Sequence, residues 1–225
     1  MKIILFAIAL CCISCMPKAN IRLTNSNDVF ISIDVAPSLT TKKLLQSFSN
    51  LNSESAFANQ EEDISNVKIE DGIEIIKLKK TSSLDFSAEL KLSPKLEQSL
   101  SLFSFNKGKS NIRLLLDRKT LSSFFESLAK EEKEYLDLLM APSLQDINMS
   151  DDEYIELIAN AYGKKIATEL KNSFLSLSFE APSKIKKVIA SPKIEHEIKN
   201  AKAFFSIPLT YILVMNEPID ISLDY

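Results

Sequence analysis

The 225-residue sequence contains no tryptophan, one histidine and only three glycines. Phosphate-binding loops and oxyanion turns need glycine, because the backbone must approach the ligand closely. Metal centres and acid–base sites need partner groups at fixed spacing, and the chain has no HxH, HExxH or cysteine cluster beside its histidine. These shortages argue against a nucleotide-binding loop, a metal centre or a common hydrolase site.

Cysteine is absent after position 15, and the chain as a whole has no excess of positive charge. The folded part therefore has no disulfide available to it. The formal net charge is −3, which argues against nucleic acid as a partner because nucleic-acid-binding surfaces are basic. A hydrophobic content of 45% with 25% charged residues is typical of a folded chain, and the length fits one domain.

The N-terminus has the pattern of an export signal. Lys2 precedes an apolar run over 3–13 that is too short to span a bilayer as a helix. The run ends in Cys12-Ile13-Ser14-Cys15, and a small residue directly before a cysteine resembles the lipobox of bacterial lipoproteins. In that family the cysteine carries diacylglycerol and becomes the acylated N-terminus. The resemblance implies a signal peptide over 1–14 and Cys15 as the lipidation site.

Two features of this resemblance leave alternatives open. Cys12 occupies the place where most lipoproteins have leucine, a change that the permissive lipoboxes of spirochaetes tolerate. Cys12 or Cys11 as the modified residue therefore stays possible, as does an unlipidated signal-anchor. A lipid on Cys15 would hold the protein on a membrane, since each buried methylene contributes about 0.8 kcal/mol. With a tether of only 15–20, the domain would lie within roughly 20 Å of the bilayer.

Residues 21–225 predict a single α+β domain. Alternation of apolar and polar residues predicts strands over 29–35, 84–92, 112–116, 175–179, 205–213 and 219–225. Helical spacing predicts helices over 40–50, 120–140 and 149–171, the last with a capping box at Ser150 and Glu153 and with a bend or close packing at Gly163. We expect a polar loop over 51–72. The predicted architecture is an antiparallel sheet of about seven or eight strands, with the helical insertion packed on its apolar face.

No constellation of side chains predicts catalysis, cofactor binding or metal binding. His196 lies between Glu195 and Glu197, where a solvated histidine in a charged turn is the simpler interpretation. The acidic clusters 151–153 and 61–63 lack the spacing of a calcium loop, and helix capping and an exposed loop explain them. Phe204 should point opposite Phe205, which is the only indication of an apolar pocket or groove.

Two further resemblances concern the C-terminal part of the chain. MSDDEYIELIANAYGKKIATELKNSFLSLSFEAPSKI resembles a segment of uncharacterised spirochaete lipoproteins. More distantly, LSFEAPSKIKKV followed by AFFSIPL resembles LppM-type lipoprotein domains, which are α+β and are linked to the envelope and to lipid-like ligands. Ser183-Lys184 replaces the glycine common in LppM-type turns. Neither resemblance carries a catalytic motif or assigns a role to a residue.

The sequence thus predicts a non-enzymatic, lipid-anchored envelope protein. Its partners would be the membrane, through Cys15, and either a hydrophobic ligand or another envelope protein near the bilayer. The short tether favours the periplasmic face. The alternative is a surface-exposed lipoprotein that binds an extracellular or host partner, and a hydrolase is the third possibility.

Overall fold

The computed structural model describes residues 17–26, 28–36, 38–40, 62–69, 73–82, 85–92, 103–106, 110–127, 133, 137 and 139–225. The predicted signal peptide 1–14, Cys15 with its alternatives Cys11 and Cys12, and most of the predicted helix 40–50 lie outside these residues.

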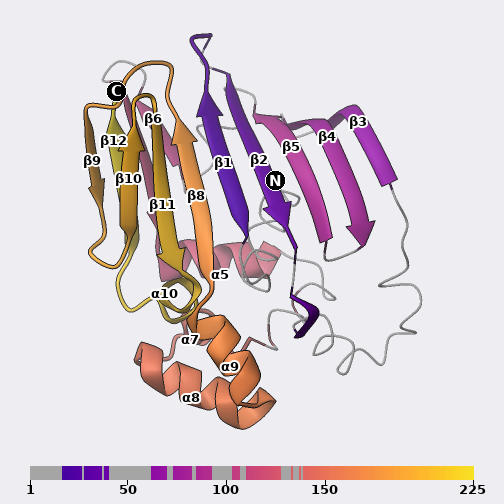
Figure 1. Cartoon of the computed structure of the whole chain (residues 1–225), viewed down its shortest axis with the longest axis vertical. Coiled ribbons are helices and arrows are strands. Elements are labelled where there is room, and N and C mark those ends of the chain that lie inside the picture. Colours follow the sequence, from indigo (N-terminus) through magenta and orange to yellow (C-terminus); the bar gives the residue numbers. More distant parts are fainter. Residues whose placement is uncertain are drawn as a thin grey trace.

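The fold is α+β, as predicted, and is built on two sheets (Figure 1). The larger sheet has eight strands in the order β10-β11-β8-β1-β2-β5-β4-β3. In chain order these are β1 (Lys18–Leu23), β2 (Val29–Val35), β3 (Glu62–Ile69), β4 (Ile73–Ser82), β5 (Asp85–Leu92), β8 (Phe174–Glu180), β10 (Glu195–Lys199) and β11 (Lys202–Pro208). The smaller sheet has the order β6-β7-β12-β9. Its strands are β6 (Phe103–Asn106), β7 (Asn111–Leu116), β9 (Lys187–Ala190) and β12 (Ile219–Asp224).

One parallel pair in the larger sheet joins β1, near the N-terminus, to β8, which follows the helical segment. β1 pairs with β8 in parallel, with Lys18 opposite Ser176 and Ile21 opposite Phe179. The other pairs in both sheets are antiparallel. The N-terminal hairpin therefore lies at the middle of the sheet, between β8 on one side and β5 on the other.

The helices belong to the segment between β7 and β8, with one more after β11. They are α5 (Arg118–Ser127), α7 (Pro142–Gln145), α8 (Asp151–Tyr162), α9 (Lys164–Lys171) and α10 (Leu209–Val214). In Figure 1, α8 and α9 lie below the lower ends of the strands, and α5 lies behind the strands. The predicted helical insertion is present between β7 and β8.

The apolar faces of both sheets contribute to a single core. On β1 and β2, Ile21, Leu23, Ile31 and Ile33 are buried. Successive strand residues point to opposite faces, so the intervening polar residues lie on the other side of the sheet. Buried residues of β7 and β12 and every residue of α10 except Thr210 join the same cluster, which also includes Tyr154 of α8.

Two sheets rather than one is the main departure from the predicted architecture. Alternation marks strands but does not say which strands pair, so the second sheet could not be separated from the first. The predicted strand 205–213 is also wrong in its second half, where α10 follows Pro208. Residues 209–215 are buried without exception, and a segment buried on all sides carries no period to distinguish helix from strand.

Three shorter segments also differ from the prediction. β3 occupies part of the predicted loop 51–72, so Glu62 and Asp63 lie in a strand. β1 begins at Lys18, inside the predicted tether 15–20. His196 lies in edge strand β10 rather than in a turn.

The capping box and the bend in the third helical segment are confirmed. Ser150 Oγ accepts a hydrogen bond from the Glu153 backbone N–H, and Glu153 Oε2 accepts from the Ser150 backbone N–H at 2.8 Å. Gly163 divides the segment into α8 and α9 with φ of 92°, a backbone region that side chains strongly disfavour.

Arg118 joins three segments at the end of α10. Its guanidinium donates to the carbonyls of Met215 at 2.9 Å, Ile147 at 2.9 Å and Val214 at 3.2 Å. A cation at the C-terminus of a helix satisfies carbonyls that have no partner within the helix. This contact fixes α10 beside α7 and the start of α5.

Candidate functional site

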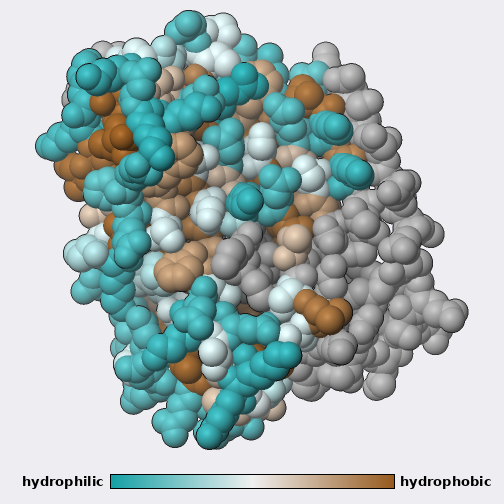
Figure 2. Space-filling view, viewed as in Figure 1, coloured by the Kyte–Doolittle hydropathy of each residue, from teal (hydrophilic) through white to brown (hydrophobic). Residues whose placement is uncertain are grey.

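The outer face of the larger sheet carries rows of polar side chains in register across its strands. One row contains Glu197, Phe204, Ser178, Asn20, Ser32 and Glu89. The next row contains Glu195, Ser206, Ser176, Lys18, Asp34 and Ser87. In the space-filling view, teal and pale residues prevail over the middle of this face (Figure 2).

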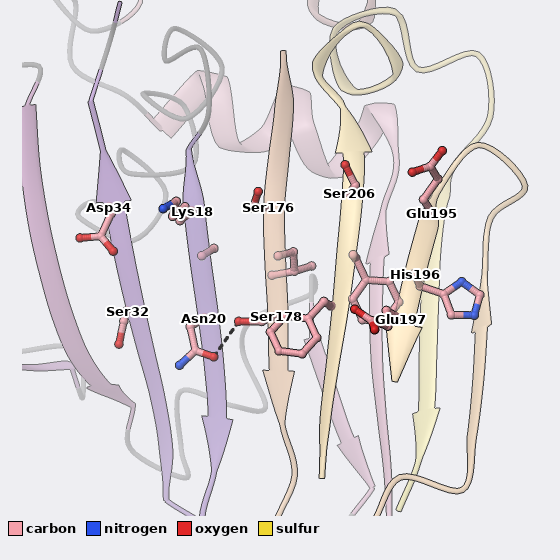
Figure 3. A pocket seen from close by; sticks show the side chains of 14 residues that line it. Lys18, Asn20, Ser32, Asp34, Ser176, Ser178, Glu195, His196, Glu197 and Ser206 are labelled. Atoms are coloured by element: carbon pink, nitrogen blue, oxygen red, sulfur yellow. Dashed lines mark hydrogen bonds between the residues drawn. The ribbon is translucent and has the colours of Figure 1, made fainter. Parts of the chain in front are cut away.

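A hollow of about 580 Å³ lies where these two rows cross β11, β8, β1 and β2. Its lining also includes residues of β10, and Figure 3 shows the contributing side chains on neighbouring strands. The hollow forms because serine and asparagine side chains are short. The side chains of the adjacent row, on the other side of the Asn20 row from Lys18, are longer, and we call this row the upper row: Lys199, Lys202, Glu180, Arg22, Phe30 and Lys91. We call the hollow itself the polar hollow.

The long side chains of the upper row are engaged with their neighbours. Lys202 Nζ lies 3.0 Å from Glu180, and Lys199 Nζ lies 3.0 Å from Glu197. Arg22 lies 3.6 Å from Glu89 and 4.6 Å from the centre of the Phe30 ring. Such exposed pairs contribute at most about 1 kcal/mol each, but they hold the rim of the polar hollow in place.

Most polar groups inside the hollow have no partner among the residues that the structure describes. Ser178 Oγ donates to Asn20 Oδ1 at 2.8 Å, as the dashed line in Figure 3 marks. Among the residues that the structure describes, Ser32, Ser176, Ser206, Lys18, Asp34 and Glu195 form no side-chain hydrogen bond or ion pair. Their donors and acceptors are available to a ligand or to water.

Phe204 supplies an apolar surface at one side of the hollow. Its side chain is 39% exposed and lines the hollow, while Phe205 packs against Phe179 on the opposite face with ring centres 5.8 Å apart. The predicted opposite orientation of the two rings is confirmed. Most of the lining residues are polar, but most of the surface that they expose to the hollow is carbon, so the site combines polar groups with an apolar surface.

His196 stands at the edge of this site and is exposed. Its ring stacks on Phe205 at 6.0 Å, and in Figure 3 its imidazole points away from Ser178. Within the described part of the chain, no group of three or more histidine, cysteine or acidic side chains is arranged to hold a metal ion. The hollow therefore has hydroxyls and carboxylates but no nucleophile with a base directed at it.

The acidic cluster 151–153 has a structural role. Glu153 completes the capping box, and the hydrogen bonds from Ser150 lower the pKa of its carboxyl group. Lys193 Nζ lies 2.8 Å from Asp151, and Lys171 Nζ lies 3.2 Å from Asp152. Of the second cluster, Glu61 lies outside the described residues and the other two members belong to β3.

Two other carboxyl groups with lowered pKa lie away from the hollow. Hydrogen bonds from Thr120 lower the pKa of Asp117 at the start of α5. A hydrogen bond from Arg113 lowers the pKa of Asp220 on the smaller sheet. Both arrangements stabilise local structure, and neither carboxyl group lines the polar hollow.

Comparisons with known proteins assign this chain to no family. No protein-family model matches it, and no curated protein or solved structure matches it significantly. The resemblances to lipoproteins stay predictions. Within the part of the chain that the structure describes, no helix is long and apolar enough to cross a bilayer.

Sequence reasoning did not identify the residues of the polar hollow. Ser176 and Ser178 alternate with leucine and phenylalanine, which is the usual sign of a solvated strand face. Ser178 and Asn20 are 158 residues apart, and only the β1–β8 pairing brings them together. The small size of the outward-facing residues on 29–35 and 174–180 was the one available signal.

Proposed function

We propose that this protein is a non-enzymatic binding protein of the bacterial envelope, anchored to a membrane by a lipid on Cys15, and that the polar hollow is its binding site. The observation that carries the proposal is the hollow itself. Short polar side chains whose donors and acceptors have no partner in the described part of the chain lie at the centre of the larger sheet.

The absence of an assembled base or metal centre around the hollow supports binding rather than catalysis. The hydroxyl of Ser178 donates to an amide oxygen, which is not a base. Activation of a serine needs a base within hydrogen-bond reach and a further group that orients it. The described lining offers no such pair.

The position of β1 supports binding close to the membrane. Lys18 lines the hollow, and the carbonyl of Pro17 accepts a hydrogen bond from the Ser176 backbone N–H at 2.9 Å. Three residue steps from Cys15 to Lys18 cover about 10 Å at most. An anchor on Cys15 would therefore hold the hollow near the bilayer surface, where an envelope component can reach it.

The lining offers polar groups within a surface that is largely carbon, so it fits a partner that presents both kinds of group. Among its described side chains, Phe204 alone is a large exposed apolar group. This lining serves either of the two partners that the sequence predicts, a hydrophobic ligand or another envelope protein. The alternative of a surface-displayed protein with an extracellular or host partner uses the same hollow.

Metabolic labelling tests the anchor. Cells grown with an alkyne-bearing palmitate should label the wild-type protein, whereas Cys15→Ala should not be labelled. Cys12→Ala is the matched control and should keep the label. Retention of label by Cys15→Ala with loss in Cys12→Ala would move the lipidation site and contradict the proposal for Cys15.

Protease treatment separates the periplasmic proposal from the surface alternative. We expect digestion only after the outer membrane has been permeabilised. Digestion on intact cells would favour the surface-exposed binder instead.

A further inference from the structure

We propose that the polar hollow binds an uncharged oligosaccharide; this rests on the proposed function only in taking the hollow as the binding site. The argument uses four properties of the site: its floor, its charged flanks, its aromatic side and its dimensions.

The floor of the hollow matches the chemistry of sugar hydroxyls. Each serine hydroxyl has one donor and two acceptor positions, and an asparagine side chain offers both an amide N–H group and a carbonyl oxygen. Ser32, Ser176 and Ser206 have these positions free, in the part of the chain that the structure describes. A ligand whose groups are themselves both donors and acceptors can pair with such a floor along its length.

The flanks add stronger hydrogen-bonding groups at separate points. Asp34 and Lys18 stand at one side of the hollow and Glu195 at the other (Figure 3). A carboxylate has two oxygens that can accept from neighbouring hydroxyls of one sugar ring, and such charge-assisted bonds are about twice as strong as neutral ones. These groups would fix the orientation of a sugar chain across the strands.

Phe204 supplies the surface that a sugar ring needs on its apolar side. One face of a pyranose ring presents C–H groups, and the negative face of an aromatic ring attracts them. The exposed Phe204 ring stands beside Ser178 and Glu197 in the register, so stacking and hydrogen bonding are available to the same ligand.

The dimensions of the hollow suit more than one sugar ring. Its volume of about 580 Å³ falls within the range of ligand pockets, about 300–1,000 Å³. From Asp34 on β2 to Glu195 on β10 there are four strand steps, which is about 19 Å at a spacing of about 4.8 Å. An oligosaccharide lying across the strands spans this distance.

The charge of the lining selects against acidic ligands. Among the described residues, Asp34 and Glu195 are the lining carboxylates without an ion-pair partner, against a single ammonium, that of Lys18, whereas Glu197 pairs with Lys199. Arg22, Lys199 and Lys202 beside the hollow lie 3.6, 3.0 and 3.0 Å from the carboxylates of Glu89, Glu197 and Glu180 respectively. An anionic sugar would meet like charges, so an uncharged chain is preferred.

Saturation-transfer difference NMR on the full chain, purified from membranes in detergent, tests the inference. The probes are chitotetraose, cellotetraose, maltotetraose and mannotetraose, with tetragalacturonate as the acidic counterpart. We expect at least one neutral probe to bind with a Kd below about 1 mM, and tetragalacturonate to bind at least about tenfold more weakly. No neutral probe binding, or preferential binding of tetragalacturonate, overturns the inference.

Variants locate the bound sugar. Ser178→Leu fills the floor and should weaken binding at least about tenfold, whereas Ser104→Leu makes the same change at an exposed position of β6 in the smaller sheet and should not. Asp34→Ala changes an exposed side chain, so it keeps the test valid if Ser178→Leu fails to fold, and it should also weaken binding. Unchanged affinity in a folded hollow variant overturns the inference.

The outcome for sugar binding is separable from the anchor. Loss of palmitate labelling with sugar binding intact contradicts the proposed anchor alone. Intact labelling without sugar binding contradicts the saccharide inference alone.

Discussion

The outer faces of the two sheets are both polar, but their side chains behave differently. On the smaller sheet the polar groups bind one another. Arg113 Nε and one terminal nitrogen donate to the two carboxylate oxygens of Asp220 at 2.9 and 2.6 Å. Asn111 Nδ2 donates to Ser222 Oγ, the Leu223 carbonyl and Asp224 Oδ1 at 2.8–3.2 Å.

The centre of the larger sheet shows the opposite arrangement. Its side chains are short, and most have no protein partner within the described residues. A hydrogen bond contributes to stability only when both partners are supplied by the protein. The smaller sheet therefore uses its polar face for stability, and the larger sheet leaves its own face available for binding.

The largest expected effect is a difference in the free energy of unfolding between substitutions on the two faces of β8. Phe179 is fully buried and contacts Phe205, so Phe179→Ala should lower the free energy of unfolding by about 3–5 kcal/mol. Ser178→Ala, one residue earlier on the hollow face, should lower it by less than about 1 kcal/mol. Urea denaturation followed by circular dichroism measures both. Equal losses would mean that the hollow face also stabilises the fold.

The same substitution on each sheet tests the comparison directly. Asn111→Ala removes three hydrogen bonds from the smaller sheet and should cost about 1–3 kcal/mol. Asn20→Ala removes one hydrogen bond from the hollow and should cost less than about 1 kcal/mol, while weakening ligand binding. A larger stability loss for Asn20→Ala, measured in the same way, would reverse the roles assigned to the two faces.

The smallest expected effect is the pH dependence from Asp220. Its pKa is lowered in the folded protein by the hydrogen bond from Arg113. The resulting stabilisation is complete above the unfolded pKa of about 3.9 and is lost as the pH falls through the lower folded value. Because the pair is exposed, the loss should be at most about 1 kcal/mol.

Asp220→Asn supplies the measurement for this effect. The variant should be slightly less stable than the wild type at neutral pH, and the difference should close as the pH falls below about 4. Thermal unfolding between neutral and acidic pH compares the two proteins. A difference that does not change with pH would show that Asp220 stabilises the sheet by contacts other than its charge.

Much of the local structure was predictable from residue patterns. The alternation over 29–35 and 219–225 predicts β2 and β12 correctly, and the capping box predicts the start of α8 at the correct residue. These signals depend on a residue and its near neighbours alone. In α10 the residues do not alternate between buried apolar and exposed polar positions. The strand prediction failed there because a fully buried segment has no polar face that would show its period.

The site could not be predicted in the same way. Ser32, Ser176 and Ser206 come from strands far apart in the chain, and each resembles an ordinary solvated serine. The register of β1 against β8 and of β11 against β8 places them side by side. That register depends on which strands pair, and long-range pairing is decided by packing of the whole core rather than by any short segment.

The sequence by itself determined the α+β class, the positions of six of the twelve described strands, the capping of α8 and the break at Gly163, because each depends on backbone geometry or on side-chain alternation within a short segment. Only the tertiary structure decided that there are two sheets, that β1 pairs in parallel with β8, and that short polar residues from four strands meet in one hollow. These features arise from contacts between distant segments, whose free energy comes from burying both apolar faces in one core.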